Sequence, residues 1–348
     1  MKERIVTLLK KYIRNIFYLL GVHIKFYSSP KSIHDFLRNY PFEVQQYELR
    51  NISDIINVRK SNDFYNKLLK LYVPNWNIKI IKSEFIRGGK GAASLNTYRK
   101  LENNIGEVLF EKIYYSSSRE LNRVTWLDEK LSFIFHKGGI NIPKIKKVFS
   151  GKVVSILYYH FEILTPYKEE DYEESLIFTT KKLYEISLQG DVLNLVGSFP
   201  NQLKDFKNHF HYNKNINLAN EYLSSSKINI IYIEEKVENS KLIITHGDIH
   251  KTNIFQGEVV IDWDSFGLFP VGFDVAYMFF QYYKNLKAYP EIENWLYTEY
   301  KDTVDISMWN EFETNFFYFL FVFYSNLFKQ NKFTELKNQL INLLQNKF

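Results

Sequence analysis

The sequence predicts an α+β protein of two lobes, a small antiparallel-sheet lobe followed by a larger, mostly helical lobe, with a helical extension before both. Runs rich in β-branched and aromatic residues begin near Ile78 and recur up to residue 164. Helical periodicity dominates residues 165–348 and also residues 1–75. We therefore expect three parts, at residues 1–75, 76–162 and 163–348.

The composition is that of a folded chain with a large core. Hydrophobic residues make up 45% of the chain, with 30 Phe and 26 Tyr but only 14 Gly and 8 Pro, which excludes a collagen-like, linker-like or disordered protein. The absence of cysteine excludes disulfides, thiolate metal sites and a cysteine nucleophile, and it fits a reducing, cytoplasmic compartment. A net charge of +6 spread over 348 residues is weak evidence for nucleic acid, so we expect no such partner.

The first 20 residues predict an amphipathic helix. Leucine and isoleucine fall on one half of the helical wheel of residues 3–20, and lysine and arginine on the other. Lys10 and Lys11 interrupt the apolar stretch that a signal peptide would need. The helix either docks its apolar face on the protein or makes peripheral contact with the inner face of an anionic membrane. The longest apolar run, Phe316–Tyr324, is far shorter than the roughly 20 residues that cross a bilayer, and it predicts a buried helix.

The strand-rich lobe is expected to be a meander with one helix. Its expected elements are strands at 78–89, 95–101 and 107–115, a helix at 116–131 and a strand at 153–164. The segment 102–106 supplies turn residues, and serines precede the helix as candidate caps. Beyond Pro166, only residues 242–261 interrupt the helical pattern, with short strands around polar residues.

The polar segment within residues 242–266, LIITHGDIHKTNIFQGEVVIDWDSF, carries the strongest chemical signal. A tight turn at residues 256–258 predicts a hairpin that brings Asn253 and Asp262 close to Asp248. Two carboxylates and an amide oxygen are the hard ligands that Mg²⁺ prefers, together with waters and phosphate oxygens. A carboxylate beside bound phosphate can also orient a hydroxyl group and accept its proton.

HGDIHKTN resembles the H-x-D-x-x-x-x-N catalytic loop of the aminoglycoside phosphotransferase and choline kinase family, whose fold is similar to that of protein kinases. VVIDWD resembles the family's metal-binding strand, and VGFDVAYMF resembles the segment that follows it. The resemblance implies that Asp248 is the catalytic base and that Asn253 and Asp262 are Mg²⁺ ligands. It also implies that His246 holds the loop in shape and that Asp274 caps its helix and braces the loop.

The resemblance extends upstream to a phosphate-covering turn, in SEFIRGGKGAASLNTYR. Glycines there let backbone N–H groups approach phosphate, although hairpins use glycine for other reasons as well. The residues implied to contact phosphate are Gly88, Gly89, Gly91 and Ser94.

Lys112 on the third strand matches the family's lysine that contacts the α- and β-phosphates, and Glu120 matches the helix glutamate that pairs with it. Two simpler interpretations are that Lys112 is an exposed strand lysine and that Glu120 belongs to a capping box with Ser117. Backbone near His160–Glu162 would meet the adenine, so Glu162 joins the implied nucleotide-binding residues.

The resemblance implies transfer of the γ-phosphoryl group of ATP, with Mg²⁺, to a hydroxyl of a sugar, an aminoglycoside or an amino alcohol. Alternatives are an inactive kinase-fold scaffold and a glycosyltransferase that uses Asp262 and Asp264 as a D-x-D motif. A glycosyltransferase would begin with alternating strands and helices. A metallohydrolase built on His246, Asp248 and His250 would need further ligands.

Three features leave the acceptor open. The acidic segment 168–174 either attracts an amine or is a solvated helix start, where acids favour the helix dipole. Lys251, at a position where the family often has proline, either contacts phosphate or points to solvent. Aromatic residues 282–297 either cage an amine or belong to the core.

Overall fold

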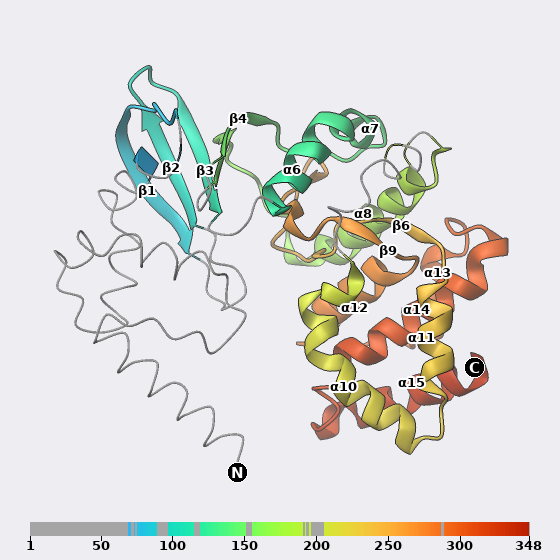
Figure 1. Ribbon diagram of the computed structural model, residues 1–348. Coiled ribbons are helices and arrows are strands. Elements are labelled where there is room, and N and C mark those ends of the chain that lie inside the picture. The colour runs from blue at the N-terminus through green and yellow to red at the C-terminus, as the bar shows by residue number, and fades with distance from the viewer. Residues whose placement is uncertain are drawn as a thin grey trace, which may run out of the picture. The chain divides into compact units, whose positions relative to one another are not determined.

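The computed structural model describes residues 69–70, 73, 75–88, 97–114, 119–150, 155–190, 192, 195, 205–286 and 289–347, most of which are the coloured ribbon of Figure 1. The chain divides into two compact units. One contains the described residues up to Asn122 together with Lys144–Glu162, and the other contains Arg123–Pro143 and the residues from Ile163 on. Nearly all of the expected extension, including the amphipathic helix at 3–20, lies outside the described residues.

The first unit is an antiparallel sheet with the strand order β1-β2-β3-β5-β4. Its strands are β1 (Ile80–Gly88), β2 (Thr97–Asn103), β3 (Val108–Tyr114), β4 (Ile145–Ser150) and β5 (Ser155–His160). The four strands expected from the sequence are present. The fifth, β4, was not expected because it is an edge strand with Phe149 as its one buried residue, so its sequence lacks alternation.

A buried polar network crosses one face of this sheet. Arg99 Nε donates to Glu111 Oε1 at 2.6 Å, and the two residues are paired across β2 and β3. The Tyr158 hydroxyl on β5 donates to Glu111 Oε2 at 2.6 Å, and Trp76 Nε1 donates to that hydroxyl at 2.8 Å. Arg99, Glu111 and Tyr158 are all 0% exposed, so the carboxylate at the centre of the network is shielded from solvent.

The second unit is mostly helical. Helix α6 (Arg119–Lys130) enters it from the first unit, and its other elements up to the polar segment are α7 (Ser132–Lys137), η1 (Glu169–Asp171), α8 (Tyr172–Ser187), η3 (Phe206–Asn208), α10 (Phe210–Ser225) and α11 (Ile230–Glu238). The remaining elements are β6 (Leu242–Thr245), β7 (Ile254–Phe255), β8 (Val259–Val260), η4 (Trp263–Ser265), β9 (Gly267–Pro270), α12 (Phe273–Tyr283), α13 (Ile292–Tyr300), α14 (Ile306–Tyr324), η5 (Asn331–Phe333) and α15 (Thr334–Lys347).

Helix α14 forms the centre of this unit and packs against α10, α12 and α15 (Figure 1). Every residue of Phe316–Tyr324 is at most 1% exposed, which confirms the buried helix expected there. Full burial of each such large apolar side chain contributes roughly 1.5–3 kcal/mol. Gly272 precedes α12 at φ 92°, and a Cβ there would lie 2.6 Å from the Phe312 carbonyl oxygen of α14. None of the helices in the described ranges has the length and apolarity needed to cross a bilayer.

Two small antiparallel sheets carry the polar segment. β6 pairs with β9, and β7 pairs with β8. β9 was not expected, because a four-residue strand that ends in proline is defined by its distant partner β6 rather than by its own sequence.

Candidate phosphotransfer site

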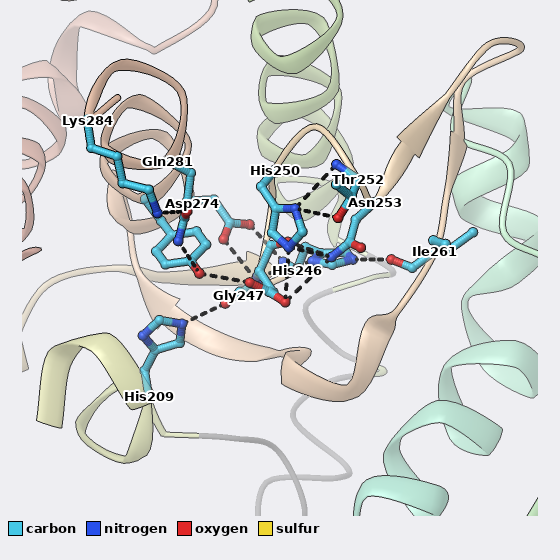
Figure 2. A network of polar contacts seen from close by, with 12 residues as sticks. His209, His246, Gly247, His250, Thr252, Asn253, Ile261, Asp274, Gln281 and Lys284 are labelled. Carbon is cyan, nitrogen blue, oxygen red and sulfur yellow. Dashed lines mark hydrogen bonds and ion pairs between the residues drawn. The ribbon is translucent and has the colours of Figure 1, made fainter. Parts of the chain in front are cut away.

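The candidate site lies in the loop between β6 and the β7–β8 hairpin (Figure 2). The hairpin is closed by a turn in which Gly257 and Glu258 have positive φ values of 77° and 54°. This confirms the turn expected at residues 256–258. The second strand ends at Val260, two residues before the expected Asp262.

The hairpin brings Asn253 beside Asp248. Asn253 Nδ2 donates to the Asp248 carbonyl oxygen at 3.0 Å and lies 3.5 Å from Asp248 Oδ2. The Ile261 N–H donates to the Asn253 carbonyl at 2.9 Å, and Asp262 is the next residue along the chain. Asp248 and Asp262 both act electrostatically on the buried imidazole of His246. The two carboxylates and the amide therefore belong to one compact loop and hairpin.

Asp262 has a left-handed backbone, with φ 63° and ψ 54°. This region costs most L-residues roughly 1–2 kcal/mol, and aspartate and asparagine tolerate it best among non-glycine residues. The turn that follows holds it in place, since the Phe266 N–H donates to the Trp263 carbonyl at 3.1 Å and both rings are buried. Strained backbone of this kind concentrates at functional sites.

His246 ties the loop to the residue before Asp262. Its Nδ1 accepts from the Asp248 N–H at 3.1 Å, so the ring proton lies on Nε2, which donates to the Ile261 carbonyl at 2.9 Å. Burial lowers the pKa of His246, which keeps this fully buried ring neutral. The geometry fits the loop-holding role implied for His246.

Asp274 braces the same loop from α12. Its Oδ2 accepts from the His246 N–H at 2.7 Å and its Oδ1 accepts from the Gly247 N–H at 2.9 Å. Burial raises the pKa of Asp274 to about 7, although both backbone bonds act to lower it. Gly247 needs its φ of 75° here, and a Cβ would lie 2.6 Å from the Ser265 carbonyl oxygen. The helix cap is Gly272, so Asp274 lies within the first turn and makes no cap of its own, contrary to expectation.

Asp248 is half-buried and ionised at neutral pH. Burial alone would raise its pKa. The side-chain contact with His250 and the hydrogen bond from the Tyr277 hydroxyl act against burial, and the pKa is lowered to about 2. Tyr277 donates to Asp248 Oδ1 at 2.8 Å. The carboxylate is therefore held in the form that can accept a hydrogen bond from a hydroxyl group.

Sequence reasoning missed two neighbours of the loop. His209 Nε2 donates to the Gly247 carbonyl at 2.7 Å, and no local pattern marks this residue 38 positions upstream. Tyr277 was missed too, although a signal exists: with Gln281 and Lys284 it forms a polar stripe at helical spacing on the apolar α12.

The upstream residues implied to bind nucleotide belong to the first unit. Lys112 on β3 is only 5% exposed, and its Nζ lies over the rings of Tyr98 and Tyr114 at 5.5 and 5.2 Å, so it is not an exposed strand lysine. Gly88 is the last residue of β1, and Glu162 is exposed just after β5. Gly89, Gly91, Ser94 and the side chain of Glu120 lie outside the described residues.

The acidic segment and Lys251 are paired with each other. Lys251 Nζ lies 2.9 Å from Glu169 Oε1 on η1, and the Tyr283 hydroxyl donates to Glu173 on α8. Tyr283 and Trp295 are buried in the core, at 6% and 8% exposure. These contacts favour the helix-start and core-packing interpretations of the acidic segment and the aromatic residues.

The donor set fits a divalent cation. The amide nitrogen of Asn253 donates to the Asp248 carbonyl oxygen. Its Oδ1, a hard oxygen ligand, therefore faces the opposite direction. With Asp262 and Asp248 this makes an all-oxygen set of the kind that suits Mg²⁺. Within the described residues no group of three or more His, Asp or Glu side chains is placed so that it could hold a metal.

Comparison with known proteins supports the resemblance. The model of the phosphotransferase enzyme family matches residues 229–293, which contain the loop, the hairpin and all of α12. This match confirms the family resemblance expected from the sequence and supports a phosphotransferase as the enzyme class. No curated protein sequence matches the chain.

Solved structures show the fold. An amicoumacin kinase in complex with AMP-PNP, Ca²⁺ and Ami is similar with a TM-score of 0.53 and 13% identity, over 84% of this chain and 95% of that chain. A choline kinase from Cryptosporidium parvum Iowa II has a TM-score of 0.45 and 15% identity, over 82% of this chain and 95% of that chain. The similarity to the amicoumacin kinase confirms the expected protein-kinase-like α+β fold. The described strands of the first unit form an antiparallel sheet, which differs from the alternating strands and helices of the glycosyltransferase alternative.

Proposed function

We propose, from the premise that residues 229–293 match the phosphotransferase enzyme family, that this chain transfers the γ-phosphoryl group of ATP to a hydroxyl group of a small molecule. The observation that carries the proposal is the placement of Asp248 and Asn253 in contact, on the loop and hairpin that also present Asp262. Sugars, aminoglycosides and amino alcohols are the acceptor classes that we propose.

Asp248 would position the acceptor hydroxyl and receive its proton. The acceptor oxygen forms a bond to the γ-phosphorus while the bond from that phosphorus to the bridging oxygen of ADP breaks, and the hydroxyl proton passes to Asp248 and then to water. A carboxylate with a pKa near 2 is a weak base, so its main contribution is orientation, with proton transfer late in the reaction.

Asn253 and Asp262 would hold Mg²⁺, which supplies charge compensation on the phosphate oxygens when it is bound. His246 and Asp274 would keep the loop in shape, since they fix the peptide groups on either side of Gly247. Lys112, Glu120 and Glu162, with Gly88, Gly89, Gly91 and Ser94, are proposed to contact the nucleotide.

The test is ADP formation from ATP and Mg²⁺ across a panel of sugars, aminoglycosides and amino alcohols, with water as the background acceptor. Asp248→Asn should lower turnover by at least about 100-fold, the contribution typical of a positioned acid or base, while the melting temperature stays close to that of the wild type. Full turnover by a folded Asp248→Asn protein would refute the assignment. Failure of the wild type to bind ATP or turn over any acceptor would favour a scaffold role.

A further inference from the structure

Helix α12 carries a polar stripe that ends on Asp248. Tyr277 and Gln281 lie one turn apart on α12, and Lys284, which caps the C-terminal end of the helix, continues the same spacing. The Tyr277 hydroxyl donates to Asp248 Oδ1 at 2.8 Å, and Gln281 Nε2 donates to that hydroxyl at 2.7 Å. Lys284 Nζ in turn donates to Gln281 Oε1, and these contacts are drawn in Figure 2.

Chemistry fixes the direction of this chain of hydrogen bonds. A lysine ammonium can only donate, so Gln281 must turn its Oε1 toward Lys284 and its Nε2 toward Tyr277. The Tyr277 oxygen then accepts from Gln281, and its single proton points to Asp248. Burial, and then Asp248 itself, raise the pKa of Tyr277 well above its ordinary value, so the hydroxyl keeps that proton.

The ring of Tyr277 is held still. It is 2% exposed, and its centroid lies 5.0 Å from that of His209, 5.5 Å from that of His211 and 5.4 Å from that of Phe323. Its hydroxyl is therefore a fixed point rather than a mobile donor. Among the described residues, the contacts of the other carboxylate oxygen of Asp248, Oδ2, are longer, at 3.5 Å to Asn253 Nδ2 and to His250 Nε2.

We propose that Tyr277, oriented by Gln281 and Lys284, is a positioning residue for Asp248, and this rests on the proposed function. The Tyr277 hydroxyl fixes Oδ1 so that Oδ2 is presented to the acceptor hydroxyl. Neither Gln281 nor Lys284 needs to touch the substrate. The lysine acts by determining which end of the amide faces the tyrosine.

Substitutions at position 281 separate positioning from mere stabilisation. Gln281→Glu keeps the shape and both contacts but turns an acceptor oxygen toward Tyr277, which then donates to the introduced carboxylate instead of Asp248. Gln281→Leu removes both contacts of the amide, and the Tyr277 hydroxyl still donates its hydrogen bond to Asp248. We expect Gln281→Glu to lower kcat about tenfold, as Tyr277→Phe does, and Gln281→Leu to lower it less than about threefold. A purely stabilising role predicts the reverse order, since the leucine loses more hydrogen bonds.

A double variant removes the effect of the added charge. If Gln281→Glu acts through the tyrosine proton, it causes no further loss of kcat in a Tyr277→Phe background, whereas a direct effect of the charge on Asp248 would persist there. Tyr300→Phe is the matched control, because Tyr300 is 0% exposed and its hydroxyl lies in a buried hydrogen bond, at 2.6 Å from the Thr180 hydroxyl. It should lower the melting temperature about as much as Tyr277→Phe while leaving kcat unchanged.

The readout is the rate of ADP formation from ATP and Mg²⁺, with KM for ATP measured alongside. We expect kcat to fall while KM for ATP stays constant. Wild-type kcat in both Tyr277→Phe and Gln281→Glu, with Asp248→Asn inactive, would overturn the positioning role and leave the proposed function standing. Full activity of Asp248→Asn would instead overturn the proposed function itself.

Discussion

The two units each contain a polar network around one carboxylate, and the networks differ in how far that carboxylate is enclosed. In the first unit both oxygens of Glu111 are occupied at 2.6 Å, by Arg99 and Tyr158, and all three residues are 0% exposed. In the described part of the second unit, Asp248 Oδ1 accepts from Tyr277 at 2.8 Å, the contacts of Oδ2 are at 3.5 Å, and the residue is half-buried. We call the Glu111 network closed, because both carboxylate oxygens are bonded within the protein, and it stabilises the fold. We call the Asp248 network open, because Oδ2 can still accept a hydrogen bond from another molecule.

The largest effect is expected from breaking the closed network. Glu111→Gln removes the charge of a buried ion pair with Arg99, and breaking such a pair costs about 3–5 kcal/mol of unfolding free energy. Urea unfolding measures this, with Asp248→Asn as the comparison. We expect Asp248→Asn to change stability by less than about 1 kcal/mol, because its carboxylate reaches solvent. Equal losses in the two variants would mean that both networks are structural.

A smaller effect is expected on the pH dependence of stability, and it comes from His211, which lies beside Tyr277 in the second unit. Burial, and then Lys284, lower the pKa of His211 to about 4, while Asp248 acts to raise it, and Lys214 and His250 also lower it. Between about pH 6.5 and 4, His211 binds a proton in the unfolded chain but stays neutral in the folded protein. The free energy of unfolding therefore decreases as the pH falls through this range.

His211→Phe should therefore gain stability relative to the wild type as the pH drops through that window, by up to about 3 kcal/mol at pH 4. Asp274, whose pKa is raised to about 7, contributes with the opposite sign, because its protonated form is favoured in the folded state. Asp274 is present in both the wild type and His211→Phe, so its contribution cancels. The difference between the free energies of unfolding of the two proteins therefore reports on His211 alone. A difference that is flat with pH would contradict this account.

The smallest effect is expected at the rim of the open network. Lys251 and Glu169 form an exposed pair, with side chains 50% and 72% exposed, and such pairs contribute less than about 1 kcal/mol. Lys251→Met should leave both stability and the KM for ATP nearly unchanged. A tenfold rise in KM would instead show that this lysine leaves Glu169 to contact phosphate.

The sequence predicted what is local and missed what depends on distant pairing. Asp248, Asn253 and Asp262 lie within 15 consecutive positions, and a glycine turn specifies the hairpin between them. His209 and the Arg99–Glu111 pair depend on helix packing and strand register, which no short pattern encodes. The edge strand β4 and the short strand β9 were missed because their partners, rather than their own residues, define them.

The most direct test of the central claim is the rise in melting temperature that ATP produces with and without Mg²⁺. We predict that ATP with Mg²⁺ stabilises the wild type, that Asp262→Asn loses most of this shift, and that Asp264→Asn, its half-buried neighbour in the same turn, keeps it. Asparagine tolerates the left-handed backbone at position 262, so the fold should persist. Equal shifts in all three proteins would contradict a metal–nucleotide site at Asp262, and equal losses in both variants would point to the D-x-D interpretation.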